Sequence, residues 1–195
     1  MFVSSEQLLF ENRMYKDPYH KIQSEVRKKK VFPLKRGLYE TDPTVPGYVL
    51  AHEIVAPSYL SFEYALWYYS MIPDRVRIYT SATFCKNQKT EIENCYGTFR
   101  YKDIPKEVYP YYYTQALFGK RGFLIASKEK ALCDFLCSAS PIRGIKDFRE
   151  YLFDGMRFDE EMFHELDFSK IRRIAPLYRK TNLYQLLKYI DKEGL

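Results

Sequence analysis

Helix-start signals near the N-terminus constrain the fold of this 195-residue chain more than any other feature of its sequence. Ser4 stands three residues before Gln7, a spacing typical of a capped helix N-terminus. Asp17 precedes Pro18, which favours a second start, because aspartate caps the free amides of a helix and proline fits its first turn. The sequence therefore predicts two short helices, the second of them over 18–30.

A β-hairpin is predicted directly after the second helix. Two short strands, over 31–34 and 38–40, flank Gly37, whose backbone freedom suits a tight turn. Pro33 cannot donate a backbone hydrogen bond, so its strand is expected at the edge of a sheet. Helix, turn, basic helix and basic hairpin follow one another as in a winged helix-turn-helix, whose second helix enters the DNA major groove.

The second predicted helix has two different faces. At about 100° per residue, Tyr19, Ile22 and Val26 share one face, which is expected to pack on a core. The opposite face is polar and basic, and consists of His20, Lys21, Ser24, Arg27 and Lys28. This basic face either meets the phosphates and bases of DNA or is simply a solvated helix side.

The net charge of +6 is concentrated at the two ends of the chain. Residues 1–36 contain nine Lys or Arg and four Asp or Glu, whereas all later residues contain 22 and 21. Residues 168–195 contain seven basic and two acidic side chains, so the middle of the chain is acidic. Two basic ends around an acidic centre point to a polyanionic partner.

These features define a set of candidate contacts with double-stranded DNA. The side chains expected to read base edges are His20, Ser24 and Arg27. The side chains expected to contact phosphates are Lys21, Lys28, Lys29, Lys30, Lys35 and Arg36. The candidates for accessory contacts from the rest of the chain are Lys128, Arg172, Arg173, Arg179 and Lys180.

The remainder of the chain predicts a larger, mixed domain. Prolines and a glycine mark 41–47 as a linker, which separates a DNA-binding segment over 1–42 from a second domain over 48–195. Residues 86–96 are expected to form a polar loop. The expected strands are 76–84, 98–101 and 122–126, and the expected helices are 48–55, 61–72, 127–136 and most of 144–195. The predicted fold class is α+β, with a reduced winged helix-turn-helix before a mixed α/β domain that has a helical C-terminus.

Neither a metal nor a cofactor is expected. Cys133 and Cys137 share a helix face, Cys85 and Cys95 flank a polar stretch, and no histidine stands near enough to complete a zinc set. The cysteines are expected to be reduced, partly buried thiols. No stretch reaches the ~20 apolar residues of a membrane span, and the N-terminus lacks the layout of a signal peptide, so a cytoplasmic location without a membrane partner is expected.

Motifs for catalysis are weak, and the chain is expected to be no enzyme. Ser127 and Lys130 fit the S-x-x-K pattern of a serine nucleophile, but a serine N-cap before a charged first turn explains both. A metal-dependent nuclease is the least supported hypothesis, because no convincing set of carboxylates is present. The tyrosine-rich run over 109–113 is either a platform for stacking bases or a segment packed on the core.

Several segments in a common order resemble the AbiEi-type antitoxins. Residues 35–39 (KRGLY) match the hairpin of that family, and residues 56–66 (APSYLSFEYAL) resemble a second segment. Ile72-Pro73 follows at the expected distance, and residues 125–134 (IASKEKALCD) resemble a third segment. The similarity covers about residues 18–140, and the segments are more specific together than any one of them alone.

The resemblance implies the antitoxin half of a type IV toxin–antitoxin, or abortive-infection, system of phage defence. Such antitoxins bind repeats in the promoter of their own operon, repress it, and counter a nucleotidyltransferase toxin without forming a stable complex with it. The family has an N-terminal winged helix and a C-terminal α/β antitoxin domain. Here only 17 residues precede the proposed recognition helix, so the module is reduced and would lean on the second domain or on a second copy.

A different reading of the basic N-terminus stays open. It is a protein- or RNA-binding module that neutralises a partner toxin directly, without operator binding. Co-purification with an adjacent gene product would favour this alternative.

Overall fold

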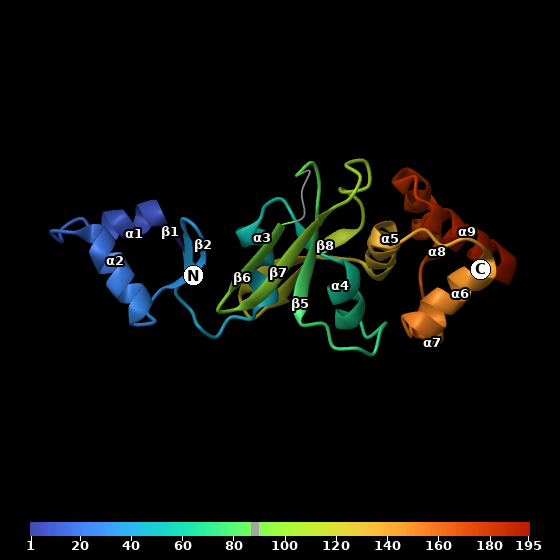
Figure 1. Cartoon of the computed structure of the whole chain (residues 1–195), viewed down its shortest axis with the longest axis horizontal. Helices are drawn as coiled ribbons and strands as arrows, with labels where there is room; N and C mark the ends of the chain where they lie inside the picture. Colours follow the sequence, from blue (N-terminus) through green and yellow to red (C-terminus); the bar gives the residue numbers. More distant parts are fainter. Residues whose placement is uncertain (87–89) are drawn as a thin grey trace.

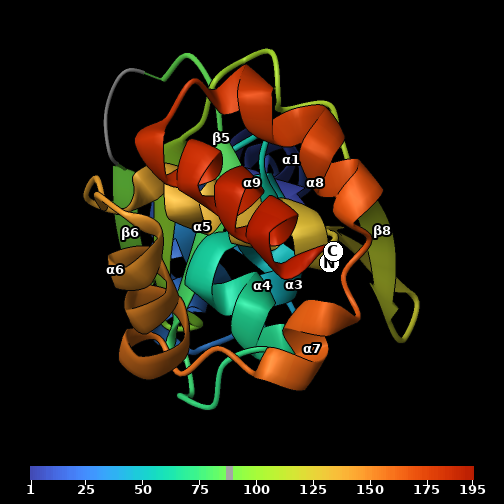
Figure 2. The same cartoon turned by 90° about the vertical axis from the view of Figure 1, so that its right-hand side faces the viewer.

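The computed structural model, which describes residues 1–86 and 90–195, is elongated and has three successive parts (Figure 1). Residues 1–42, here called the N-terminal module, lie at one end; a six-stranded sheet occupies the middle; helices form the other end. Figure 2 looks onto that helical end. The fold is α+β, which confirms the predicted class.

The N-terminal module contains a three-stranded antiparallel sheet of order β1-β3-β2 and two helices. Its own small core consists of Val3, Leu8, Ile22 and Val31. Both predicted helices and the hairpin are present, and Pro33 lies in the edge strand, as predicted. The first strand was not expected from the sequence. The bounds are β1 (Phe2–Ser4), α1 (Ser5–Glu11), α2 (Pro18–Arg27), β2 (Phe32–Lys35) and β3 (Leu38–Glu40).

The central sheet is mixed and has the order β6-β7-β5-β4-β9-β8. The pairs β5–β7 and β4–β9 are parallel, and the other neighbours are antiparallel. The three predicted strands correspond to β5, β7 and β9. The bounds are β4 (Tyr59–Leu60), β5 (Ile78–Thr83), β6 (Thr90–Asn94), β7 (Gly97–Asp103), β8 (Tyr113–Phe118) and β9 (Arg121–Ala126).

One large core joins the sheet to the helices that surround it. The helix α3 (Gly47–Ile54) packs on β9, and α4 (Phe62–Tyr68) packs on β5 and on α5 (Lys128–Ser138). The helix α4 lies inside this core, because Phe62, Ala65 and Leu66 are fully buried. The helical end consists of α6 (Ile145–Arg149), the π-helical turn η1 (Glu150–Gly155), α7 (Glu160–His164), α8 (Phe168–Ile174), the 3-10 turn η2 (Ala175–Tyr178) and α9 (Thr181–Glu193).

The prediction of a polar loop over 86–96 is wrong for the part that the structure describes, since Thr90–Asn94 form the edge strand β6; residues 87–89 lie outside the described residues. Glu91 and Glu93 are exposed, whereas Ile92 packs against the core. Glu91 is also 2.7 Å from Arg100 of β7. The acidic residues on the solvent face of the strand are typical of a loop, so the sequence alone predicts one, whereas pairing with the neighbouring strand stabilises β6.

The N-terminal module is attached to the sheet by side chains of two regions. Arg121 of β9 donates hydrogen bonds to the buried Glu40 carboxylate at 2.7 and 3.1 Å. Asn94 Nδ2 donates to the Leu34 carbonyl at 3.1 Å, and the Tyr96 hydroxyl donates to the Asp42 carbonyl at 2.8 Å. Because these bonds involve strands near both edges of the sheet, they hold the module in a defined orientation.

Candidate nucleic-acid interface

The helix α2 is positioned by a cap at its start and by one buried side chain. Asp17 Oδ1 accepts a hydrogen bond from the His20 amide at 2.9 Å, and Pro18 occupies the first turn. Ile22 is 4% exposed and belongs to the small core of the module. The predicted helix start is therefore confirmed, and so is the role of Ile22 in the core.

The apolar face of α2 is narrower than the sequence predicts. Tyr19 was expected to pack beside Ile22, but it is 69% exposed, and Val26 is only half-buried. The physical reason is the size of the module. Its two helices and three short strands provide, within the described residues, no further element that covers Tyr19.

The C-terminal end of α2 carries an uninterrupted run of exposed cations. Arg27 ends the helix, and Lys28, Lys29 and Lys30 follow it. None of these four side chains forms an ion pair or hydrogen bond with another residue that the structure describes. Cations at this end suit the helix dipole. Their exposure is compatible with phosphate contacts, and for the three lysines such contacts stay a prediction.

Two of the other predicted contacts on α2 are partly engaged inside the module. Lys21 Nζ lies 3.4 Å from Glu25 Oε1 and 4.7 Å from the ring centroid of Tyr15. The hydrogen bond with Glu25 raises the pKa of Lys21 above its ordinary value. Ser24 is half-buried, whereas His20 is exposed and accessible to a ligand.

The two basic residues of the hairpin have different surroundings. Lys35 donates a hydrogen bond to the Ile54 carbonyl of α3, so its ammonium already has a partner in the fold. Arg36 is exposed in the turn beside Gly37, which has the left-handed φ of 85° that glycine permits. Of these two, Arg36 is the side chain presented to solvent.

The five accessory candidates lie far from α2. The turn between η2 and α9 carries Arg179 and Lys180, both exposed, at the helical end of the molecule (Figure 1). Three others have partners there or near α5: Lys128 lies 3.7 Å from Glu165, Arg172 lies 2.5 Å from Asp191, and the Arg173 guanidinium lies 5.7 Å from the Tyr111 ring centroid. The central sheet separates all five from the N-terminal module.

Exposed apolar side chains gather at the tip of the module, around the turn between α1 and α2. Phe10 is 64%, Met14 88% and Tyr15 53% exposed, and Tyr19 lies on the next helix. The Arg13 guanidinium stacks over Phe10, 4.1 Å from the ring centroid. A cluster of exposed apolar side chains of this kind is a candidate contact surface. The sequence alone did not reveal it, because Tyr19 was expected to be covered.

Of the two S-x-x-K residues, Lys130 belongs to a buried network in the central domain, whereas Ser127 caps the start of α5. Lys130 Nζ lies 3.0 Å from Asp134 Oδ1 and donates to the Tyr178 hydroxyl at 2.6 Å, whereas Ser127 Oγ donates to Glu129. Asp134 pairs with Lys130 of the same helix and is also bonded to distant parts of the chain. It accepts hydrogen bonds from three distant residues: Tyr59 (3.1 Å), Ser61 (2.7 Å) and Tyr178 (2.6 Å).

Burial explains the protonation of this network. It raises the pKa of Tyr178, and of Tyr59, well above the ordinary value, and the nearby Asp134 carboxylate acts in the same direction. Both hydroxyls therefore stay protonated as donors. Two of the three segments that resemble the antitoxin family supply this network, Tyr59 and Ser61 from one and Lys130 and Asp134 from the other. In this chain, these residues join α5 to β4 and α4.

The tyrosine run over 109–113 packs mainly on the core. Tyr109 is 8% exposed, and the ring of Tyr113 stacks on that of Tyr59 at 4.8 Å between centroids. The packed alternative fits this arrangement, because a buried ring face is not accessible to a base.

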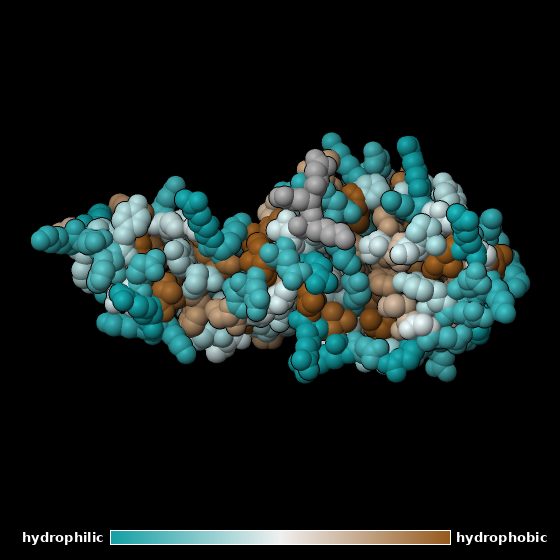
Figure 3. All heavy atoms as spheres, viewed as in Figure 1, coloured by the Kyte–Doolittle hydropathy of each residue, from teal (hydrophilic) through white to brown (hydrophobic). Residues whose placement is uncertain are grey.

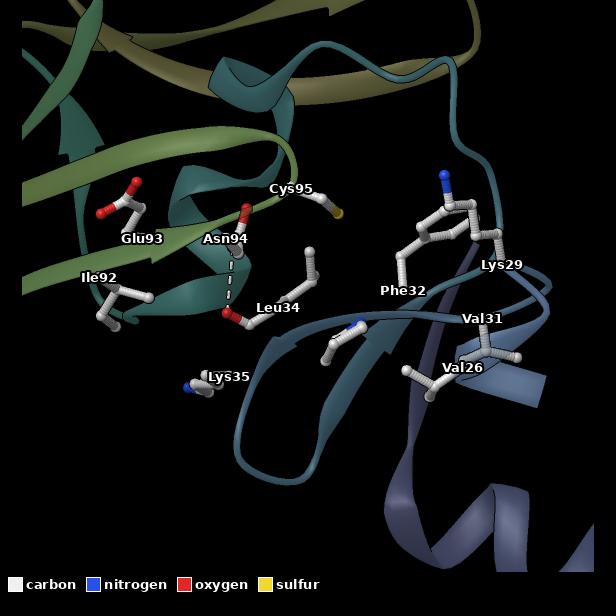
Figure 4. A pocket seen from close by; sticks show the side chains of 11 residues that line it. Val26, Lys29, Val31, Phe32, Leu34, Lys35, Ile92, Glu93, Asn94 and Cys95 are labelled. Atoms are coloured by element: carbon white, nitrogen blue, oxygen red, sulfur yellow. Dashed lines mark hydrogen bonds between the residues drawn. The ribbon is translucent and has the colours of Figure 1, made fainter. Parts of the chain in front are cut away.

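A pocket of about 560 Å³ lies where the module meets the sheet (Figure 4). Its walls come from the end of α2 and the residues after it, from the whole of β2, and from the end of β6 with Cys95 in the β6–β7 turn. The side chains that line it include Lys29, Phe32, Leu34, Glu93 and Cys95. Sequence inspection could not find this site, because its two sides are about sixty residues apart in the chain.

Three further observations bear on the kind of site. Within the described part of the chain, no three His, Cys, Asp or Glu side chains are grouped so that they could hold a metal ion. No helix among the described residues is long and apolar enough to cross a membrane. Comparison of the chain with protein-family models and with curated proteins found no match.

Proposed function

We propose that this protein is a DNA-binding transcriptional autorepressor and the antitoxin of a type IV toxin–antitoxin system. The observation that carries the DNA-binding part is the run of four exposed cations at the end of α2, none of which is paired with another residue that the structure describes. The run begins at Arg27 and ends at Lys30. Four adjacent cations on a rigid helix end are a typical electrostatic footprint for a phosphate backbone.

The arrangement of the module supports a reduced winged helix-turn-helix. A strand, two helices and a hairpin follow in this order, and the strand β1 completes the sheet beside β3. Figure 1 shows α1 and α2 at the free end of the molecule, on the side of the module that faces away from the central sheet. A duplex could therefore approach the start of α2 from the free end, whereas the cationic end of the helix lies beside β6.

The reduced module leans on the central sheet in this proposal. In a usual winged helix, an additional helix would support the recognition helix. Here Arg121 holds Glu40, and Asn94 holds Leu34, so the strands β3 and β2 of the module are tied to the central sheet. Cooperation between two copies on repeated operator sites would add to the affinity, because one short module makes few contacts.

The residues have separate roles in this interface. Lys28 and Lys30 bind phosphates, and Arg27 and His20 lie on the side of α2 that would face base edges. Arg36, at the hairpin tip, reaches the adjacent backbone or minor groove. Lys21 and Lys35 contribute less than the sequence predicts, since both have partners inside the fold.

The antitoxin role comes from the resemblance to AbiEi-type antitoxins, and the C-terminal domain over 48–195 would carry it. The implied functional partner is a nucleotidyltransferase toxin in the cytoplasm, countered without a stable complex. Expression of the chain beside the neighbouring toxin gene tests this role separately. Growth rescue by the wild type and by a variant that no longer binds DNA would support an antitoxin activity independent of repression.

A salt-dependent titration tests DNA binding. A duplex from the promoter of its own gene is compared with a scrambled duplex, for the wild type and for Arg27→Ala/Lys28→Ala. The logarithm of affinity should fall with the logarithm of salt by about 0.9 per phosphate contact. The double variant should lose about one phosphate contact, that of Lys28, together with the base contact of Arg27, so its preference for the promoter duplex should also fall. The control variant is Arg179→Ala/Lys180→Ala, at the other end of the molecule. Equal weak binding to both duplexes, unchanged in the α2 variant, would contradict the proposal.

A second candidate function is a module that binds a partner protein or RNA, and one observation favours it. Phe10, Met14 and Tyr15 are exposed at the tip of the module, where a duplex held by Lys28 and Lys30 would not cover all of them. The variant Phe10→Ser/Met14→Ser separates the two functions. Loss of toxin neutralisation with operator affinity intact would favour direct partner binding.

A further inference from the structure

The pocket at the junction of the module and the sheet has the composition of a small-molecule site. Its apolar walls come from both sides: Val31 and Leu34 are 6% and 2% exposed, and Phe32 and Ile92 are half-buried. Ligand pockets usually have such apolar walls, a volume of roughly 300–1,000 Å³ and a position between two parts of a protein. At about 560 Å³, this pocket could enclose a molecule the size of two fused rings.

Lys29 gives the pocket a cation in an unusual backbone position. Its φ is 54°, in the left-handed region, where glycine is the favoured residue at the end of a helix. The turn is fixed by two backbone hydrogen bonds of 3.0 Å, from Lys29 to Val26 and from Lys30 to Glu25. The Lys29 side chain lies at the edge of the pocket next to Phe32 (Figure 4). The backbone conformation at this position thus favours glycine, yet the residue there has a long cationic side chain.

The other polar groups of the pocket decide which ligand charge it accepts. Asn94 is already used, since its amide donates to the Leu34 carbonyl and its Oδ1 accepts from the Tyr96 amide at 2.8 Å. Glu93 lies at the opposite end from Lys29 (Figure 4), and neither forms an ion pair with a residue in the described ranges. Lys35 also lines the pocket, but its ammonium already donates to the Ile54 carbonyl. A negative group is therefore favoured at the Lys29 end and disfavoured at the Glu93 end.

We propose that this pocket binds a small organic anion, an apolar aromatic body with one carboxylate or sulfonate group that pairs with Lys29. The body packs between Phe32, Leu34 and Ile92, and the end of the ligand beside Glu93 is neutral or cationic. Such a ligand contacts α2 and β6 at once, so it links the module to the sheet. The proposal concerns a ligand site only and does not depend on DNA binding, because its test contains no DNA.

The probe for the test is 8-anilinonaphthalene-1-sulfonate, which combines two apolar ring systems with a sulfonate. Fluorescence titration of the full chain should show saturable binding at one site. Ile92→Trp fills the pocket from an edge strand and should weaken binding about tenfold. Leu117→Trp adds the same ring at the exposed hairpin tip of β8 and should leave binding unchanged.

Charge variants test the role of Lys29. Lys29→Gly removes the ammonium without straining the backbone, so it should fold well and weaken binding about tenfold, as expected for one lost charge-assisted contact. Glu93→Gln should leave binding unchanged or strengthen it. Lys28→Gln is the matched control for an exposed lysine outside the pocket, and it should bind like the wild type.

A footprint on two cysteines locates the bound probe. Cys95 lies on the pocket wall, whereas Cys85 is exposed beyond the far end of β5, and both are free thiols. Saturating probe should slow alkylation of Cys95 by iodoacetamide several-fold without changing the rate at Cys85, as measured by peptide mass spectrometry. Equal rates at both cysteines, or binding that Ile92→Trp and Lys29→Gly leave unchanged, would overturn the proposal.

Discussion

Glu40 and Arg121, 81 positions apart in the chain, form a two-pronged ion pair that connects the last strand of the N-terminal module to β9. The Glu40 side chain is fully buried, and it also accepts the backbone amides of Thr41 and Asp42 at 2.9 Å each. A buried carboxylate with this many donors orients the module rigidly. Any DNA contact made by α2 therefore depends on a bond that lies on the other side of the module.

This ion pair predicts a specific loss of stability in acid. Burial alone would raise the pKa of Glu40, but the hydrogen bonds from Arg121, the N-terminal ammonium and Asp42 outweigh it and lower the pKa from 4.5 to about 2. The carboxylate therefore stabilises the fold above pH 4.5, and this contribution of about 3 kcal/mol is lost as the pH falls toward 2. Urea unfolding between pH 2 and 6 measures it.

The variant Arg121→Met should flatten this acid dependence, because the lowered pKa rests largely on the guanidinium. Lys120→Met, at the adjacent exposed position of the β8–β9 turn, is the control and should keep the wild-type profile. An unchanged pH profile in Arg121→Met would contradict this account of Glu40.

Because Asp134 is part of a buried network, we expect replacement of its lysine partner to lower the stability of the fold strongly. Lys130→Met should lower the free energy of unfolding by about 3 kcal/mol, because it leaves the Asp134 charge buried without its cation. Lys128→Met, two residues earlier on the same helix, removes only a partly exposed pair at 3.7 Å and should cost less than about 1 kcal/mol. Guanidinium unfolding distinguishes them, and similar losses would show that the network is not the cause.

The left-handed backbone at Lys29 leads us to expect that glycine at this position stabilises the protein. Lys29→Gly should raise the free energy of unfolding by about 0.5–1 kcal/mol, since glycine adopts the left-handed backbone at φ 54° without steric cost. Lys28→Gly should do the opposite, because Lys28 has an ordinary φ of −81° and glycine adds only chain entropy there. Thermal unfolding of both variants checks the sign, and destabilisation by Lys29→Gly would refute the prediction.

Gly47 predicts a strongly destabilising substitution at the start of α3. A Cβ at Gly47 would lie 2.3 Å from the Tyr79 ring and 2.7 Å from the Tyr96 carbonyl, so Gly47→Ala should cost about 2 kcal/mol through overpacking. A Cβ at Gly155 would meet its nearest atom at an ordinary 3.7 Å, and Gly155→Ala is therefore the control. Circular dichroism of thermal unfolding measures both, and equal midpoints would contradict the predicted clash.

The sequence by itself determined the local elements of this protein. Three local features could be predicted, because each depends on residues only a few positions apart: the cap at Ser4, the helix start at Asp17–Pro18 and the turn at Gly37. The same holds for the edge position of Pro33, which follows from its missing amide proton. The cationic end of α2 was also readable, since charge and helix period are properties of the chain itself.

Only the tertiary structure decided which of these side chains remain available and what surrounds them. Lys35 donates a hydrogen bond to Ile54, Asp134 accepts one from Tyr178, and Tyr19 remains exposed. The residues next to each of them in sequence do not indicate any of these outcomes. The strand β6 was hidden for the same reason, because its stability comes from pairing with β7 rather than from its own composition. Hydrogen bonding and burial between distant segments depend on how the layers pack, and this packing places the pocket between α2 and β6.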